Sequence, residues 1–220
     1  MWALAAALAA IGTIGGQLRW NSIRYIKTGA TVTFLVLAVR AALMGLHPTL
    51  SIGFSVSLAV ATIADYLLGK PDNSDVFQAG LAAFLIAYLT YAIVLLIAVP
   101  DGGIPVWPTV AIAVAGVAIA GVQYHTLQLP DDLKLPVILY VVVVTFFLFS
   151  GALFVLSPLV TNGVFTWHQG AIAIGVAFIY VSDSLIAHNL FRSPLPNDEL
   201  FVMPTYYIGQ AAMVAALYAG

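Results

Sequence analysis

Eight apolar runs of about 20 residues follow one another along this 220-residue chain, separated by short polar breaks. An α-helix needs a run of that length to cross the hydrocarbon core of a bilayer. Breaks such as Gly69-Lys70-Pro71 and Pro100-Asp101-Gly102 contain the residues that end helices. We therefore predict an all-α integral membrane protein, a compact bundle of about eight transmembrane helices forming one domain over residues 1–220. The predicted spans are 2–19, 28–46, 49–69, 76–98, 105–126, 135–157, 167–190 and 200–219.

The composition argues against a water-soluble fold. Charged residues make up 7% of the chain and hydrophobic residues 62%, whereas soluble domains carry about 25% charged residues. An outer surface that faces lipid is apolar, so a shortage of charge is expected there. The net charge of -2 and the lack of a basic run argue against nucleic acid as a partner. The absence of cysteine excludes disulfides, thiolate metal ligands and a cysteine nucleophile.

The basic residues predict the orientation of the spans. Six of the 7 Lys and Arg residues lie in or beside the odd-numbered connections: Arg19, Arg24, Lys27, Lys70, Lys134 and Arg192. Cytoplasmic connections carry an excess of Lys and Arg, so we predict that both termini lie on the non-cytoplasmic side.

Arg40 falls inside the second run, where it could snorkel outward, pair with an aspartate or bind an anionic group. Residues 2–19 lack the positive region that precedes the apolar part of a signal peptide, so we interpret them as a span.

Two aspartates interrupt the apolar runs, Asp65 near the end of the third and Asp183 near the end of the seventh. A carboxylate inside a span costs roughly 2.5 to 3.5 kcal/mol on insertion scales and usually marks a functional site. Both runs cross in the same direction, so the two carboxylates should lie at nearly the same depth. In one shared cavity, repulsion and low dielectric would leave a neutral acid beside a carboxylate, the arrangement that acid–base hydrolysis needs. The alternative is that each aspartate separately caps a helix or bonds a neighbouring one.

The third and seventh runs also contain similar short segments, Ala64 to Leu68 and Ser182 to Ile186. The offset of four spans preserves orientation, so a duplication of four spans would explain the matched depths of the aspartates.

The four histidines show no i, i+4 zinc-ligand spacing. The predicted topology places His168 on one side of the membrane and His125 and His188 on the other. We therefore expect no metal.

Six short motifs stand in order between Lys27 and Gln210. They are Lys27-Thr28; Ala64 to Leu68; Phe77, Gly80, Phe84, Ala87 and Tyr91; Pro136, Val137 and Tyr140; Phe178, Ser182, Asp183, Ser184 and Ala187; and Tyr206, Tyr207 and Gln210. Together they resemble the lysoplasmalogenase family of multispanning membrane proteins, also called YhhN-like. The chain departs from that pattern at Tyr88, where the family usually has His, and at Thr28, where it usually has Pro.

The resemblance implies hydrolysis of the vinyl ether bond of lysoplasmalogens to a fatty aldehyde and glycerophosphocholine or glycerophosphoethanolamine. The family's two essential aspartates match Asp65 and Asp183, and no cofactor is required. The expected partners are this lysophospholipid and membrane lipid, in the cytoplasmic membrane if the chain is bacterial. We expect the substrate to be bound by Lys27, near its phosphate, and by Tyr88, Tyr91, Tyr140, Ser182, Tyr206 and Gln210.

Two other functions stay open. Asp65 and Asp183 would suit a small proton-coupled transporter as relay carboxylates, and a lipid-binding or sensor protein without catalysis would suit the departure at Tyr88. Carriers often interrupt their binding-site spans with Gly or Pro. Here the third and seventh spans contain only Gly53, Gly170 and Gly175, all away from the aspartates. That pattern favours an enzyme with a fixed pocket.

Overall fold

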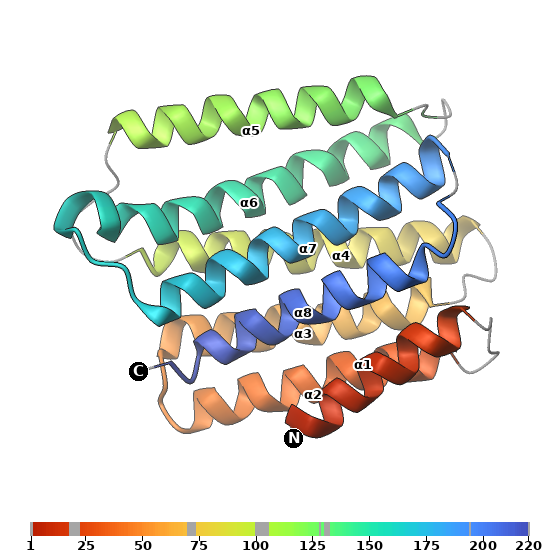
Figure 1. Cartoon of the computed structure of the whole chain (residues 1–220), viewed down its shortest axis with the longest axis horizontal. Helices are drawn as coiled ribbons and strands as arrows, with labels where there is room; N and C mark the ends of the chain where they lie inside the picture. The colour runs from red at the N-terminus through yellow and green to blue at the C-terminus, as the bar shows by residue number, and fades with distance from the viewer. Residues whose placement is uncertain are drawn as a thin grey trace.

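The computed structural model describes residues 2–17, 23–69, 74–99, 106–127, 129, 133–193 and 195–219. These residues form eight helices and no strand. The helices lie side by side along one axis, and successive helices run in opposite directions (Figure 1). Their bounds fall within five residues of the predicted runs, so the predicted all-α bundle is confirmed. The helices are α1 (Trp2–Gln17), α2 (Ile23–Leu43), α3 (Pro48–Leu68), α4 (Ser74–Ile97), α5 (Val106–Thr126), α6 (Lys134–Asn162), α7 (Trp167–Phe191) and α8 (Glu199–Ala216).

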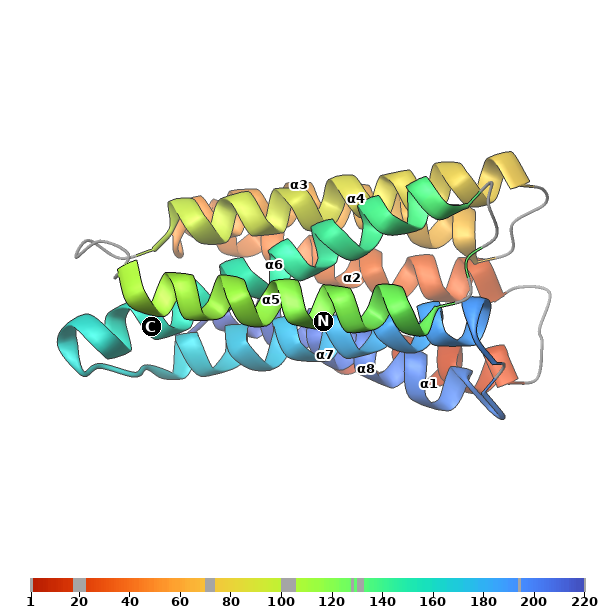
Figure 2. The ribbon, with the colours of Figure 1, turned by 90° about the horizontal axis from the view of Figure 1, so that it is seen from above.

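Contacts between helices close a ring in the order α2, α3, α4, α6, α7 and α8. Two helices lie outside this ring. α1 packs against α2 and α8, and α5 packs against α6 at the edge of the bundle (Figures 1 and 2). Some of these contacts recur when each helix is replaced by the helix four places later, with α1 counted after α8. The contact α2–α3 then corresponds to α6–α7, α3–α4 to α7–α8, and α4–α6 to α8–α2. These three ring contacts thus each have a counterpart four helices on, whereas the packing of α1 against α8 has no similar counterpart between α5 and α4.

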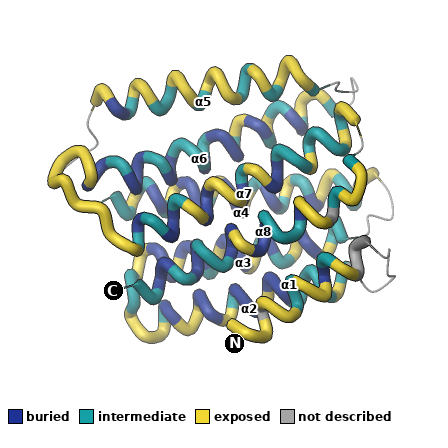
Figure 3. The backbone as a smooth tube through the Cα atoms, viewed as in Figure 1, coloured by how far each residue is buried: buried dark blue, intermediate teal, exposed yellow. Residues whose placement is uncertain are grey.

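Helices α2 to α7 are long and apolar enough to cross a membrane, whereas α1 and α8 are shorter apolar helices. Large hydrophobic side chains are exposed on the outside of the bundle, among them Leu43, Ile97 and Val117. In Figure 3 the exposed positions follow the outer faces of the helices, and the buried positions lie between them. An apolar exterior is what lipid requires. By length, composition and surface, the chain is a multi-pass membrane protein.

The alternation of helices brings the odd-numbered connections to one end of the bundle. Arg24, Lys27, Lys134 and Arg192 all lie in the helix turns or connections at that end, which we call the basic end. Arg19 and Lys70 lie outside the described residues. Arg40 is exposed in the last turn of α2, at the opposite end. It therefore lies closer to a helix end than the sequence predicts, which favours snorkelling over pairing with an aspartate.

Two facing glycines bring α7 and α8 into close contact. A Cβ on Gly209 would lie 2.9 Å from the carbonyl oxygen of Gly175, and a Cβ on Gly175 would lie 3.0 Å from the carbonyl oxygen of Gly209. Only glycine leaves room for such an approach of two backbones. Nearer the basic end, the Ser182 hydroxyl donates a 3.0 Å hydrogen bond to the carbonyl of Val202. These contacts fix α8 against the helix that carries Asp183.

Candidate active site

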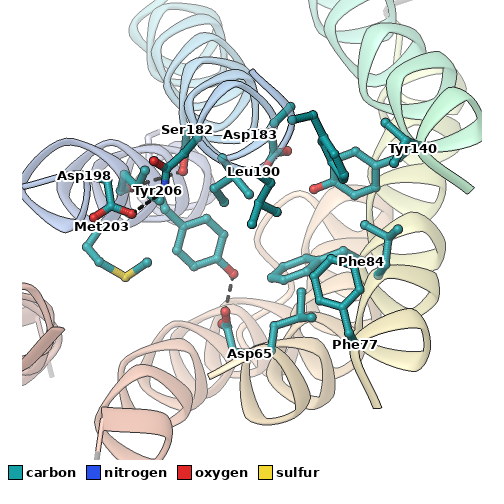
Figure 4. A pocket seen from close by; sticks show the side chains of 18 of the residues that line it. Asp65, Phe77, Phe84, Tyr140, Ser182, Asp183, Leu190, Asp198, Met203 and Tyr206 are labelled. Atoms are coloured by element: carbon teal, nitrogen blue, oxygen red, sulfur yellow. Dashed lines mark hydrogen bonds between the residues drawn. The ribbon is translucent and has the colours of Figure 1, made fainter. Parts of the chain in front are cut away.

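A cavity of about 350 Å³ lies toward the basic end of the bundle. Both aspartates line it, Asp65 from α3 and Asp183 from α7, so the structure brings together the pair that the sequence singled out (Figure 4). The rest of the wall is largely apolar, with side chains that include Leu68, Phe77, Leu81, Phe84, Val137, Val141, Ile186, Leu190, Val202 and Met203. An apolar cavity with a few convergent polar groups is the usual form of a small-molecule site.

Asp65 is buried and receives hydrogen bonds from two other helices. The Thr31 hydroxyl on α2 donates to its Oδ2 atom, and the Tyr206 hydroxyl on α8 donates to the same oxygen at 3.0 Å. Lys27 is near enough to attract this carboxylate electrostatically. Donated hydrogen bonds and a nearby cation favour the ionised form of a carboxyl group. These contacts offset part of the cost of burying a charge at Asp65, so they favour its ionised form.

Asp183 is equally buried, and tyrosines from two helices approach its carboxyl group. The Tyr88 hydroxyl on α4 donates to Oδ1 at 3.2 Å, while Oδ2 has no hydrogen-bond partner among the described residues. The Tyr140 hydroxyl points toward this carboxyl from α6 (Figure 4), and Asp65 is near enough to repel its charge. A buried charge with an unpaired oxygen is costly. The surroundings of Asp183 therefore suit a neutral acid better than those of Asp65 do.

The two tyrosine–aspartate bonds are related by the same count of four helices as the ring contacts. Tyr206 on α8 bonds Asp65 on α3, and Tyr88 on α4 bonds Asp183 on α7. The helices four places after α4 and α7 are α8 and α3, when α1 is counted after α8. The pair of Tyr88 and Asp183 therefore corresponds to the pair of Tyr206 and Asp65. Tyr88, which stands where the family usually has His, thus contacts one of the two aspartates. Each half of the chain supplies an aspartate whose tyrosine donor comes from the other half.

The other expected substrate contacts divide into two groups. Lys27, Tyr140, Ser182 and Tyr206 line the cavity. Tyr91 and Gln210 are fully buried outside its wall, where the Tyr91 hydroxyl donates to Gln210 Oε1 at 3.0 Å and joins α4 to α8. This placement favours a structural role for Tyr91 and Gln210.

Three polar residues near the cavity were not singled out from the sequence. Thr31 follows Lys27 by one helical turn, so the i, i+4 spacing could have identified it. Asp198 and Asn189 line the cavity from the connection after α7 and from α7 itself. The sequence carries no signal that separates Asp198 from its polar neighbours.

The described histidines do not gather at this cavity. His47 and His168 stack at the opposite end of the bundle, with ring centroids 4.3 Å apart, and each contacts a backbone carbonyl near the C-terminus of the chain. Among the described residues, no group of three or more His, Cys, Asp or Glu side chains could hold a metal ion.

The fold and the site are those of a multi-pass helical membrane protein with two buried aspartates in one largely apolar cavity. A family model matches residues 23–217, nearly the whole chain. The chain belongs to the YhhN family, which is the lysoplasmalogenase family, and the resemblance seen in the motifs is confirmed. Comparisons with curated proteins and with solved structures gave no match.

Proposed function

We propose that this protein is a lysoplasmalogenase-like hydrolase. It cleaves the vinyl ether bond of a lysoplasmalogen and releases a fatty aldehyde and glycerophosphocholine or glycerophosphoethanolamine. The observation that carries the proposal is the convergence of Asp65 and Asp183 on one cavity inside an apolar bundle. Family membership supports the same class of reaction. The largely apolar wall suits a single lipid chain, and Lys27 at the basic end suits its phosphate.

The hydrogen bonds support different roles for the two aspartates. Asp65 accepts two hydrogen bonds on one oxygen, which favours an ionised group that can stabilise a cation and accept a proton. The bond from Tyr88 to Asp183 is longer, and Asp183 Oδ2 has no partner among the described residues, which favours a protonated group that can act as the acid. An acid and a carboxylate on either side of an oxocarbenium-like centre are the arrangement that glycoside hydrolysis uses.

The reaction begins when Asp183 transfers its proton to the outer carbon of the double bond, whose electron pair forms the new C–H bond. The carbon attached to oxygen becomes an oxocarbenium ion, which the Asp65 carboxylate stabilises. Water adds to that carbon while Asp65 accepts a proton, and a hemiacetal forms. Asp65 then gives its proton to the glycerol oxygen as the C–O bond breaks, while Asp183 takes the hydroxyl proton. The aldehyde leaves, and both carboxyl groups return to their starting states.

The proposal includes a topology in which all eight helices cross the membrane and both termini lie on the non-cytoplasmic side. The packing of α1 against α2 and α8, and of α8 within the ring, supports treating these shorter helices as spans. The basic residues at one end support placing that end in the cytoplasm. In a bacterium the membrane would be the cytoplasmic membrane.

The test uses purified protein in detergent with a lysoplasmalogen and a saturated acyl lysophospholipid of equal chain length. Wild type should release aldehyde from the vinyl ether substrate alone. Asp65→Asn and Asp183→Asn should each abolish release while eluting from size-exclusion chromatography as wild type does. Asp75→Asn is the matched control, because Asp75 lies exposed in the first turn of α4, at the basic end and away from the cavity wall. Folded wild type that releases no aldehyde would refute the hydrolase and favour transport or lipid sensing.

A further inference from the structure

A third aspartate, Asp198, lines the same cavity from the connection between α7 and α8. It is half-buried and lies at the basic end, where α8 begins (Figure 4). The reaction proposed above does not use it. A carboxylate on the wall of this cavity can make a structural contact, bind a ligand, or do both.

The usual structural role of an aspartate at this position is to cap a helix. An N-cap side chain accepts a hydrogen bond from an amide in the first turn. Asp198 immediately precedes α8 but makes no side-chain cap bond. Its Oδ2 atom instead accepts a 2.6 Å bond from the side-chain amide of Asn189. The carboxylate is thus held by Asn189 on α7 rather than by the first turn of α8.

Asn189 acts as the support for this carboxylate. Its amide nitrogen donates to Asp198, and its Oδ1 atom accepts a 2.7 Å bond from the backbone N–H of Leu195. The side chain therefore ties the last part of α7 to the connection that follows. Because both Asn189 and Asp198 line the cavity, this pair forms a pre-organised acidic group on its wall.

The cavity also carries a cation at the same end. Lys27, from the early part of α2, lines the wall together with Asp198. A cationic and an anionic side chain beside an apolar chamber complement a lipid whose headgroup carries both signs of charge. A headgroup with phosphate alone would find attraction at Lys27 and repulsion at Asp198, and such repulsion is a common source of specificity.

We propose that Asp198, positioned by Asn189, binds the ammonium group of a zwitterionic lysophospholipid whose phosphate lies at Lys27. The inference rests on the proposed function for the identity of the lipid, and it adds the residue that selects the headgroup. Asp198 is then a specificity residue for amine-bearing headgroups, and Asn189 is a positioning residue that acts through it. The carboxylate–ammonium contact belongs to the stronger class of charge-assisted interactions.

The kinetic test compares three vinyl ether lysolipids of one chain length, bearing ethanolamine, choline or an unsubstituted phosphate. Asp198→Asn should raise KM for the two amine substrates about tenfold, as expected for loss of one interaction with a charged group, and leave kcat unchanged. KM for the phosphate substrate should stay the same or fall, because a repulsive charge is removed. Asn189→Ala should act in the same direction, and Asp75→Asn should change none of the three. Equal changes for all three substrates, or no change at all, would overturn the inference.

A binding measurement separates this inference from the proposed reaction. Saturated alkyl ether lysolipids bearing ethanolamine or phosphate alone cannot undergo vinyl ether cleavage, and their binding is measured by thermal shift in detergent. Wild type should bind the ethanolamine lipid more tightly, and Asp198→Asn should lose that preference. If the preference shifts but no aldehyde forms from vinyl ether substrates, the hydrolase is wrong and the headgroup site stands. If aldehyde forms and the preference does not shift, the headgroup site is wrong and the hydrolase stands.

Discussion

Replacing Gly209 by Ala should force α8 away from α7. The new methyl group would lie 2.9 Å from the carbonyl oxygen of Gly175 and 2.9 Å from the amide nitrogen of Ile179. Both are backbone atoms of α7, so no rotation of a side chain can relieve the contact. Ordinary van der Waals contact begins at 3.4 Å, so the two helices would have to separate locally by about 0.5 Å.

The cost follows from the rigidity of the packing. Forcing an extra methyl group into a well-packed interior destabilises a protein by about 1–3 kcal/mol. In a chain of this length, 1 kcal/mol lowers Tm by about 2–4 °C, so we expect a fall in Tm of about 2–12 °C. Activity should fall as well, because Tyr206 lies one turn before Gly209 on α8 and donates to Asp65.

The assay is thermal unfolding of purified protein in detergent, with Gly121→Ala as the matched control. Gly121 lies in α5, and a Cβ there would meet nothing within 4 Å. Ala is the better helix former by about 1 kcal/mol, so this control should keep Tm unchanged or raise it slightly. Equal Tm values for Gly209→Ala and wild type, or an equal loss in both variants, would refute the packing argument.

Two further predictions test the hydrogen bonds. Tyr206→Phe should lower kcat for aldehyde release about tenfold or more, because a donor to a charged group stabilises the ionised form needed at Asp65. Tyr88→Phe should lower kcat less, since Asp183 acts as the neutral acid. Equal losses of kcat in the two variants would contradict this assignment of roles. Tyr91→Phe removes the donor to the buried Gln210. It should lower the free energy of unfolding by about 1–3 kcal/mol, measured by thermal unfolding, and leave KM unchanged. A changed KM would indicate that Tyr91 contacts the substrate instead.

The sequence predicts the helices well because each one coincides with an apolar run bounded by polar residues. It also predicts the two central site residues, since a carboxylate in an apolar span stands out against its surroundings. Asp65 and Asp183 could be identified without any knowledge of which helices touch. Matched depth followed from the helical rise and from the direction of the spans.

Contacts between helices were harder to predict, because they depend on the order of packing. Thr31 illustrates the difficulty, since a Thr in a helix usually bonds a carbonyl of its own helix, as Thr28 and Thr33 do here. The Thr31 hydroxyl also lies within 3.5 Å of such a carbonyl, that of Lys27. Only the position of α2 beside α3 brings the Thr31 hydroxyl to Asp65. Likewise, the bond between Tyr91 and Gln210 depends on how α4 and α8 are placed across the bundle.

The peripheral helix α5 affects the site by setting the direction in which the later helices run. It carries the chain from one end of the bundle back to the other, so that α6 runs in the same direction as its neighbour α4 (Figure 1). If α4 led directly into α6, every later helix would be reversed, and Asp183 would lie at the end of the bundle far from Asp65. An even number of crossings in each half is therefore a condition for one shared site.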